Sequence, residues 1–590
     1  MAPSADTPSP PPSPTQGRPK ILVPEKVSSE GLALLRTLYE VDTRTGLSAD
    51  DILALIPHYH GLIVRSETKV TASLLAAGHK LRVVARAGVG VDNIDVEAAT
   101  KHGIIVVNSP AGNIVAAAEH TIALLLATAR NVGRADASLK AGKWERSKLV
   151  GVEVGHKTLG IIGLGKVGMK VARMAIGLGM KVTALDPYAS PEVAKSAGVS
   201  LVSSLGDLLP VVDFLTIHTP LLASTLNLLG EDELKKMKPS ARVLNVARGG
   251  VYNEEALLRG LDEGWIAGAG LDVFTKEPLV EGSVAARLAA HERVVATPHL
   301  GASTVEAQEN VSMDVCTQVL EILRGGLPTA AVNAPLILPE EYRRLQPFVK
   351  LVEKMGSLYT QHYARNSPSS SRHFELSYHG ELAGISNTRP LFAALVKGLV
   401  SPISDANVNI VNATLITKDR GIAIDEKHVR GDGGGAHASA VTLRSFDAGA
   451  AEEQVIEGYV SGKSIFISKL DRFTANFHPE GTLLILHNYD EPGKIGHVGM
   501  VVGRHGINIT FMQVAGLNRE ARAKAEATAA SSVADGPVEG DAVDGPAPME
   551  GIQLTKEALM ILGVDGEVSP EVLEDLRRAE GILDVSLVRL

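Results

Sequence analysis

The sequence predicts an α/β protein in which doubly wound parallel sheets are followed by smaller α+β modules. From Lys20 onward, short β-branched runs alternate with helical patterns, which is typical of right-handed βαβ units on a parallel sheet. The turn GLGKVG at 163–168 stands directly between an apolar strand pattern and a helical pattern. After about Pro328 this alternation stops, and strands and helices mix in a different order.

The bulk composition is that of a globular protein with several domains. The chain of 590 residues is far longer than the ~250 to 300 residues at which one hydrophobic core stops growing. Its net charge of -9 gives no electrostatic reason to expect a nucleic-acid partner. The single cysteine, Cys316, excludes an internal disulfide framework and a multi-cysteine metal site, and no metal site is predicted.

The chain starts with a segment rich in proline and serine, 1–19, which we expect to be a disordered tail. It lacks the basic-then-apolar pattern of a secretory signal, and no apolar stretch reaches the about 18 to 20 residues that span a bilayer. No membrane partner and a cytoplasmic location are therefore expected. The tail leaves targeting to an organelle open.

Two runs of βαβ pattern precede the change at Pro328. In the first, the predicted strands include ILV, GLIV and LRVVA, and it is followed by a helical stretch, Ala117–Ala129, that is too short to cross a membrane. In the second, which begins at Lys157, the strands end as KVTALDP, DFLTIHTP, ARVLNVARGG, AGAGLDVF and RVVATPHLGA. Ligands bind at the carboxyl ends of such strands, so the polar residues at these ends are the candidate site.

The glycine turn predicts a dinucleotide site. Gly163, Gly165 and Gly168 permit a tight turn, a close approach of the backbone to a pyrophosphate and packing of a helix on a strand. Asp186 ends the next predicted strand, about 20 residues on, where a carboxylate would accept hydrogen bonds from the adenosine ribose. No arginine follows Asp186 to neutralise a 2'-phosphate, so the predicted cofactor is NAD.

Three residues at later strand ends suit the oxidation of a 2-hydroxy acid. His299 can take the hydroxyl proton in one direction and return it in the other, because an ordinary histidine titrates near pH ~6.5. Glu277 can orient the imidazole ring through its second nitrogen. Arg248 can grip the substrate carboxylate with two parallel charge-assisted bonds. We predict these three as the catalytic residues.

The blocks GLGKVG, NVARGG, GLDVFTKEP and TPHLGAST resemble the signature segments of the D-2-hydroxyacid dehydrogenase family, over about residues 20–330. The resemblance implies a Rossmann-type NAD-binding domain, 106–299, inserted in a flavodoxin-like substrate domain, 20–105 plus 300–328. It places the family's arginine, glutamate and histidine on the three residues above. It also implies further residues that line the cofactor, which are Val89, Lys166, Val167, Thr219, Val246, Ala247, Asp272, Gly301 and Ala302.

The segments GLIVRSETKVT, VVARAGVGVDNID and NSPAGNIVAAAEHT resemble the phosphoglycerate dehydrogenase branch of that family. Arg65 and Ser66 then correspond to residues that bind the substrate phosphate, and Asn113 to one that contacts the substrate. A phosphate needs cations and donors, which this pair supplies. The resemblance implies NAD-dependent oxidation of D-3-phosphoglycerate to 3-phosphooxypyruvate, the first step of serine biosynthesis.

The C-terminal part is predicted to be regulatory. Residues 335–475 resemble the intervening domain of the long form of this branch, and 480–590 read as βαββαβ, which resembles the ligand-sensing ACT domain with an acidic low-complexity insertion at 518–549. The resemblance implies that serine can bind between paired copies at Asn488, Asp490 and Asn508. A pure dimerisation module is the alternative, and a homodimer or homotetramer is expected.

Two other functions stay open on the sequence alone. One is a reductase of the same family that acts on hydroxypyruvate, glyoxylate or 2-oxoglutarate. The other is a non-catalytic NAD-sensing co-repressor, against which the intact set of Arg248, Glu277 and His299 argues.

Overall fold

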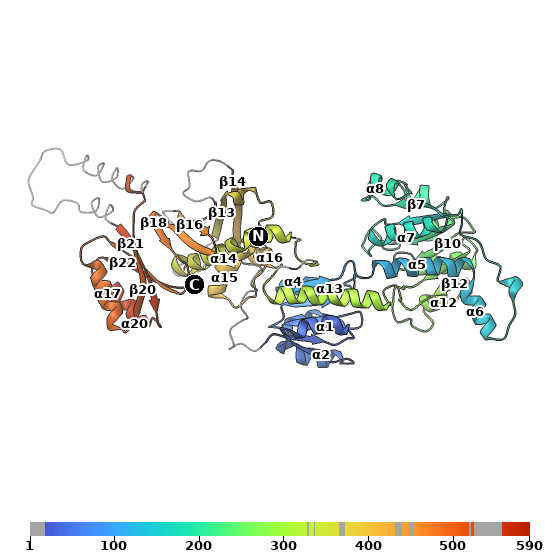
Figure 1. Cartoon of the computed structure of the whole chain (residues 1–590), viewed down its shortest axis with the longest axis horizontal. Helices are drawn as coiled ribbons and strands as arrows, with labels where there is room; N and C mark the ends of the chain where they lie inside the picture. Colours follow the sequence, from blue (N-terminus) through green and yellow to red (C-terminus); the bar gives the residue numbers. More distant parts are fainter. Residues whose placement is uncertain are drawn as a thin grey trace, which may run out of the picture. The chain divides into compact units, whose positions relative to one another are not determined.

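The computed structural model describes residues 18–364 except 327, 329 and 336, and then 372–430, 439–447, 453–518, 521–523 and 557–590 (Figure 1). The described chain forms two compact units. One holds the residues up to Ile94 together with Val106–Ala330, and the other holds Asp95–Ile105 and Ala331–Leu590. Nearly all of the predicted tail and of the predicted acidic insertion lies outside the described residues.

The first sheet has five strands in the order β2-β1-β3-β4-β5, which is the flavodoxin order. Its strands are β1 (Lys20–Val23), β2 (Glu40–Thr43), β3 (Gly61–Val64), β4 (Val83–Arg86) and β5 (Ile105–Asn108). The helices between them in the chain are α1 (Ser29–Arg36), α2 (Ala49–Leu55), α3 (Ala72–Ala77) and α4 (Val96–Lys101). Because the order reverses between β1 and β3, the loops after these two strands diverge and leave a crevice at the carboxyl edge.

The second sheet has seven strands in the order β12-β11-β10-β9-β6-β7-β8, with parallel pairing throughout. Its strands are β6 (Thr158–Ile162), β7 (Lys181–Leu185), β8 (Val199–Leu201), β9 (Phe214–Ile217), β10 (Arg242–Asn245), β11 (Gly268–Leu271) and β12 (Val294–Ala296). This is the dinucleotide-binding order extended by one strand, and its direction reverses between β6 and β9. The predicted α/β fold class is confirmed.

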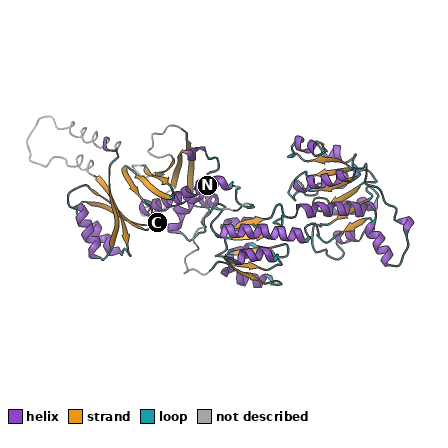
Figure 2. Ribbon diagram, viewed as in Figure 1, coloured by secondary structure: helices purple, strands orange, loops and turns teal. Residues whose placement is uncertain are grey.

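Helices cover both faces of the second sheet (Figure 2). They are α5 (Ile114–Ala129), α7 (Lys166–Gly177), α8 (Pro191–Ser196), α9 (Leu205–Leu208), α10 (Glu231–Lys235), α11 (Glu254–Asp262) and α12 (Val284–Ala290). Helix α6 (Val132–Lys140) contacts α5 and has no buried residue. Successive strand residues point to opposite faces, so Ile161 joins the core cluster with α5 and α7, whereas Ile162 joins the cluster with α11. Burial on both faces explains why these strands read as continuous apolar runs.

Helix α13 (Val305–Leu323) packs against α1, β3 and β4 of the first sheet. Its Ser312 hydroxyl accepts the Ser28 N–H at 3.2 Å, and the Leu320 carbonyl accepts the Tyr39 hydroxyl at 3.3 Å. Cys316 of this helix is buried, and burial raises the pKa of its thiol to about 12, so it is a packing residue. The exact domain limits within this part of the chain stay a prediction.

The C-terminal unit contains two further sheets. The larger has the order β14-β13-β15-β16-β17-β18 and is accompanied by α14 (Pro339–His362), α15 (Arg389–Val400) and α16 (Ala413–Asp419). Its strands are β13 (Arg372–Gly380), β14 (Ile422–Val429), β15 (Ser439–Asp447), β16 (Gln454–Ser461), β17 (Ser464–Leu470) and β18 (Phe473–Phe477). No helix among the described residues combines the length and the apolar character that a membrane span requires.

The smaller sheet follows the predicted βαββαβ pattern, with the order β20-β21-β19-β22. Its elements are β19 (Thr482–Tyr489), α17 (Lys494–Arg504), β20 (Asn508–Gly516), β21 (Glu557–Asp565), α20 (Pro570–Arg577) and β22 (Ile582–Arg589). Alternate residues of β19 again serve two cores, since Leu484 packs with α17 and α20, whereas Leu483 joins the core shared with α14.

Candidate active site

The glycine turn after β6 has the geometry that a bound pyrophosphate needs. Gly163 adopts φ +91°, a conformation that L side chains rarely adopt. A Cβ on Gly168 would lie 2.1 Å from the Gly163 carbonyl oxygen, so only glycine lets α7 pack this closely on the turn. Gly165 precedes α7 with open space around its Cα, and no side chain caps the helix. The first N–H groups of α7, at Lys166 and Val167, therefore stay available to phosphate oxygens.

Asp186 follows β7 and holds the glycine turn. Its Oδ2 accepts the Leu164 N–H at 2.7 Å, and its Oδ1 accepts the Tyr188 N–H at 2.8 Å. Each carboxylate oxygen can accept a second hydrogen bond, so ribose hydroxyls can still be bound. The strand order reverses between β6 and β9, and Thr219 follows β9 at that point. Its buried hydroxyl has no partner among the described residues. These features fit a dinucleotide.

His299 and Glu277 form a hydrogen-bonded pair. His299 Nδ1 lies 2.7 Å from Glu277 Oε2, and Glu277 Oε1 accepts the Phe274 N–H at 2.8 Å. Burial alone would raise the pKa of Glu277, but the bonds from His299 and Phe274 outweigh it and lower that pKa. The imidazole is 44% exposed, so its second nitrogen is open to a ligand.

Asp272 lies directly after β11 and holds the segment that carries His299. Its Oδ1 accepts the Leu300 N–H at 2.7 Å and the Thr297 hydroxyl at 2.6 Å, and its Oδ2 accepts the Gly301 N–H at 2.8 Å. Since Oδ2 accepts a single bond from the described residues, it retains capacity for an amide N–H of a nicotinamide.

Arg248 follows β10 and reaches the loop after β4. Its Nε lies 3.3 Å from Asp92 Oδ2, and a Cβ on Gly90 would lie 2.0 Å from its guanidinium. The backbone around Arg248 is fixed by Asn245, which accepts the Ala247 N–H at 2.9 Å and donates to the Arg248 carbonyl at 2.7 Å. Loops of the two sheets thus meet at this guanidinium.

Arg65 stands at the end of β3, beside the switch point of the first sheet. The buried carboxylate of Glu25, in the loop after β1, accepts the backbone N–H groups of Arg65, Glu67 and Thr68 at 2.8 to 3.1 Å. The Asn93 amide donates to the Arg65 and Thr68 carbonyls at 2.9 and 2.7 Å. The backbone of 65–68 is therefore held from both sides, with Arg65 half-exposed and Ser66 exposed on it.

A third arginine, Arg86, completes this group and was missed by the sequence argument. It ends β4 next to Val64, and its Nε is buried without a partner among the described residues. Burial, followed by repulsion from Arg248, lowers the pKa of Arg86 to about 10. Its signal in the sequence is a charge at the end of an apolar strand, as for Arg65. A guanidinium whose Nε is buried without a partner among the described residues favours an anionic ligand.

The other predicted residues lie at the same strand ends. Val246 and Ala247 precede Arg248, Ala302 follows Gly301, and Val89 lies in the loop after β4, where its carbonyl accepts the Asn108 amide. Asn113 directly precedes α5, and its side chain caps no N–H of that helix.

The three predicted effector residues do not gather within one copy of the chain. Asn488 is paired with Ala558 near one end of the small sheet, whereas Asn508 is paired with Asp565 at the opposite end. Asp490 directly follows β19 and is exposed. Asn488 is buried, and its Oδ1 has no partner among the described residues. A site that combines these residues therefore requires a second copy.

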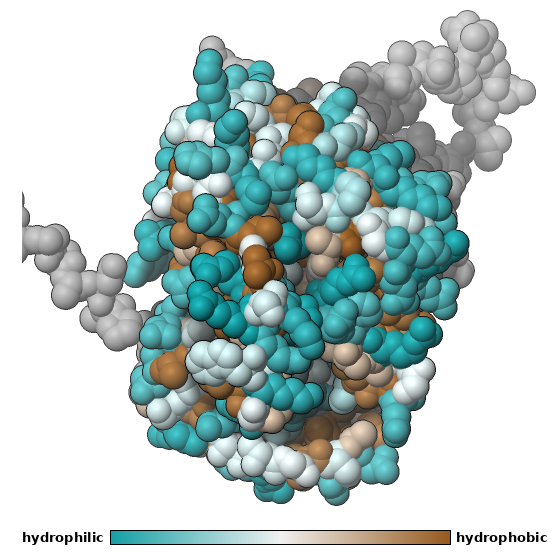
Figure 3. Space-filling view, turned by 90° about the vertical axis from the view of Figure 1, so that its right-hand side faces the viewer, coloured by the Kyte–Doolittle hydropathy of each residue, from teal (hydrophilic) through white to brown (hydrophobic). Residues whose placement is uncertain are grey.

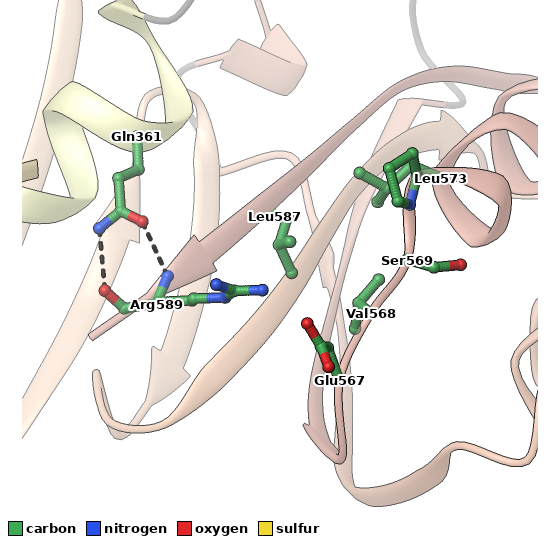
Figure 4. A pocket seen from close by; sticks show the side chains of 8 residues that line it. Gln361, Glu567, Val568, Ser569, Leu573, Leu587 and Arg589 are labelled. Atoms are coloured by element: carbon green, nitrogen blue, oxygen red, sulfur yellow. Dashed lines mark hydrogen bonds between the residues drawn. The ribbon is translucent and has the colours of Figure 1, made fainter. Parts of the chain in front are cut away.

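A separate cavity of about 600 Å³ lies beside the small sheet (Figure 4). Gln361 of α14 closes one side by exchanging two hydrogen bonds of 2.9 Å with the backbone of Arg589. The lining residues are Gln361, Glu567, Val568, Ser569, Pro570, Leu573, Leu587 and Arg589. None of the predicted effector residues is among them.

Comparisons with known proteins agree with this geometry. The D-isomer specific 2-hydroxyacid dehydrogenase NAD-binding domain matches residues 122–301, and the D-3-phosphoglycerate dehydrogenase intervening domain matches 344–466. D-3-phosphoglycerate dehydrogenase 2, chloroplastic, of Arabidopsis thaliana is 43% identical over 85% of this chain and 81% of its own length. The D-3-phosphoglycerate dehydrogenase of Synechocystis sp. is 41% identical over 84% and 87%, and that of Archaeoglobus fulgidus is 38% identical over 97% and 100%.

Proposed function

The chain belongs to the family of D-3-phosphoglycerate dehydrogenases, and on that premise we propose that it oxidises D-3-phosphoglycerate to 3-phosphooxypyruvate with NAD. This is the first step of serine biosynthesis. The observation that carries the proposal is the His299–Glu277 pair, joined at 2.7 Å at strand ends that follow a dinucleotide turn. NAD, when bound, supplies the acceptor for the hydride from carbon 2.

His299, Glu277 and Arg248 each have a separate role at the reacting carbon. Because Nδ1 of His299 is bonded to Glu277, the other ring nitrogen is the one that takes the proton of the 2-hydroxyl group. The Glu277 carboxylate orients the ring and stabilises its charged form. Arg248 grips the substrate carboxylate through its planar fork and so presents carbon 2 in one orientation.

We also propose that the phosphate group is held at the end of β3. Arg65 supplies a fork and Ser66 a hydroxyl, and Arg86 adds positive charge from the neighbouring strand end. The support is the fixed backbone of 65–68 and the half-buried guanidinium of Arg86 at the neighbouring strand end. Asn113, directly before α5, is proposed as a further substrate contact. An unphosphorylated acid would leave these cations unpaired, which disfavours the alternative substrates.

Replacement of His299 tests the reaction. With His299→Gln we expect kcat to fall by at least about 100-fold, since general base catalysis contributes ~10²–10⁴-fold. NADH binding, followed by nicotinamide fluorescence, should stay unchanged. His79→Gln, at an exposed histidine of the same unit, is the matched control. Turnover that survives His299→Gln would remove the role given to His299.

We propose that the chain forms at least a dimer through residues 132–150, here called the arm, which contain α6. Leu139, Trp144 and Val150 of this arm are 60%, 84% and 80% exposed. Figure 3 shows the side of the molecule to which α6 belongs, where isolated apolar groups interrupt a mainly hydrophilic surface. Large exposed side chains on a protruding arm are typical of a surface that a second copy covers.

For the small sheet we propose serine binding between paired copies. The support is the amide oxygen of Asn488, which has no partner among the described residues, and the exposed Asp490 and Asn508 at opposite ends of the sheet. Titration of the full chain with L-serine in a calorimeter, with D-serine as control, tests this. Heat that persists in Asn488→Leu would remove Asn488 from the site.

A further inference from the structure

His120 touches the buried carboxylate that holds the catalytic loop. It lies on α5, and its side chain is 19% exposed. His120 Nε2 is 3.2 Å from Asp272 Oδ1 and 3.0 Å from Thr297 Oγ1. A carboxylate only accepts, so the ring nitrogen carries the proton and donates toward both oxygens.

Asp272 in turn fixes the backbone on both sides of His299. Its carboxylate accepts the Leu300 and Gly301 N–H groups, and its own carbonyl accepts the His299 N–H at 2.9 Å. His299 adopts φ +56°, a left-handed conformation that costs free energy in a residue other than glycine. Such a conformation persists only where the surroundings enforce it, and the Asp272 bonds are those surroundings.

A buried carboxylate needs compensation for its lost hydration. The Asp272 side chain is fully buried, and among the described residues the side chains of His120 and Thr297 donate to it. Without His120, Asp272 Oδ1 would lose one of its donors, and the Thr297 hydroxyl would lose the group that donates to its oxygen. Both changes act on the segment 297–301.

We propose that His120 is a positioning residue for the reaction, which acts through Asp272 and Thr297 on the backbone that presents His299. The proposal rests on the function proposed above. His120 thereby connects helix α5 to the strand end that carries His299.

The test compares His120→Leu with His120→Gln, whose amide can still donate to the same oxygens. We expect His120→Leu to lower kcat about tenfold while the Kd for NADH changes less than twofold, because the loop loses orientation and not its cofactor contacts. His120→Gln should recover most of the lost kcat. An unchanged kcat in His120→Leu, or equal losses in both variants, would overturn the proposal.

A double-variant cycle separates this role from general destabilisation. His120 and Thr297 act on the same carboxylate oxygen, so the kcat losses of His120→Leu and Thr297→Val should not multiply when combined. Losses that multiply would contradict the shared path. Wild-type turnover of 3-phosphooxypyruvate is the reference. If the wild type does not turn over this substrate, the proposed function is rejected. If the wild type is active and His120→Leu is equally active, only the role given to His120 is rejected.

Discussion

Arg65 owes its position to a carboxylate 40 residues earlier in the chain. Glu25 gathers three backbone N–H groups from 65–68, and this arrangement explains how a short loop can present a guanidinium and a hydroxyl to an anion. The strand-end positions of Arg65, Arg248 and His299 could be predicted because apolar strand patterns end just before them. The supporting Glu25, Asn93 and His120 could not, since they act only through tertiary contacts.

Removal of Arg65 should weaken binding of the phosphorylated substrate selectively. Loss of a hydrogen bond to a charged group costs about 1.5 to 3 kcal/mol, so Arg65→Gln should raise KM for 3-phosphooxypyruvate by roughly 10- to 150-fold. KM for NADH should change little. Steady-state kinetics on both substrates measure this.

The control for this prediction is Lys80→Gln, which removes an exposed cation from the loop that precedes β4, at the opposite edge of the first sheet. If Arg65→Gln left KM for 3-phosphooxypyruvate unchanged, the phosphate would bind at another place.

Protonation of His218 should make the stability of the folded chain depend on pH. It follows β9 beside Thr219, and burial lowers its pKa to about 4. An unfolded histidine titrates near ~6.5, so between these values the unfolded state binds more protons, and stability falls as pH drops from about 6.5 toward 4. From pH ~7 to ~5 this one group should cost about 2 kcal/mol.

Urea denaturation of the wild type and of His218→Gln at both pH values measures that contribution. The stability gap between the two proteins should narrow by about 2 kcal/mol at the lower pH, because glutamine does not titrate. A gap that stays constant would show that His218 is not buried in its neutral form.

At the scale of elements, α7 and the glycine turn form one unit whose geometry depends on Gly168. Gly168→Ala would place a methyl group 2.1 Å from the Gly163 oxygen and push the helix from the turn. We expect the Kd for NADH to rise by more than about tenfold, equivalent to about 1.4 kcal/mol. Fluorescence titration gives this value.

Gly177, the last residue of the same helix, is the matched control, because a Cβ there would meet nothing within 4 Å. Gly177→Ala should leave NADH affinity unchanged and stabilise the helix by about 0.5 to 1 kcal/mol. Equal affinities in the two alanine variants would argue against the close packing of turn and helix.

The order of helices and strands along the chain could be predicted more fully than the order of strands within the sheets. Alternating strand and helix patterns predicted both parallel sheets, and the helix at Ala117–Ala129 is found within α5. The mixed six-stranded sheet was not predictable, because β13 pairs in parallel with β14 and antiparallel with β15, and periodicity does not encode partners. The carboxyl-edge site was predictable, since it depends only on strand direction.

At the scale of the whole molecule, hydrogen bonds join segments that lie far apart in the chain. Residues 95–105, which the sequence places with the first sheet, group with the C-terminal unit. The Gly103 carbonyl accepts the amides of Asn407 and Asn409 at 3.2 and 2.6 Å, and Asn333 donates to the Ile104 carbonyl at 2.9 Å. Contacts between residues that are 229 to 306 positions apart in the chain leave no local sequence signal.

Assembly is predicted to depend on the exposed arm. Trp144→Asp should shift the chain toward the monomer, because a charge would replace a large apolar side chain in the proposed contact. Light scattering after size-exclusion chromatography measures the mass. Tyr188→Asp, at another highly exposed aromatic residue, is the control. An unchanged mass in Trp144→Asp would move the interface away from the arm.

The central claim is that one site joins a hydride-transfer centre to a phosphate site. The most direct measurement compares kcat/KM for NADH oxidation with 3-phosphooxypyruvate and with its unphosphorylated analogue, hydroxypyruvate. We predict that the phosphorylated acid is used at least about 100-fold more efficiently, which corresponds to about 2.7 kcal/mol from the phosphate contacts. Equal efficiency on the two acids would contradict the account.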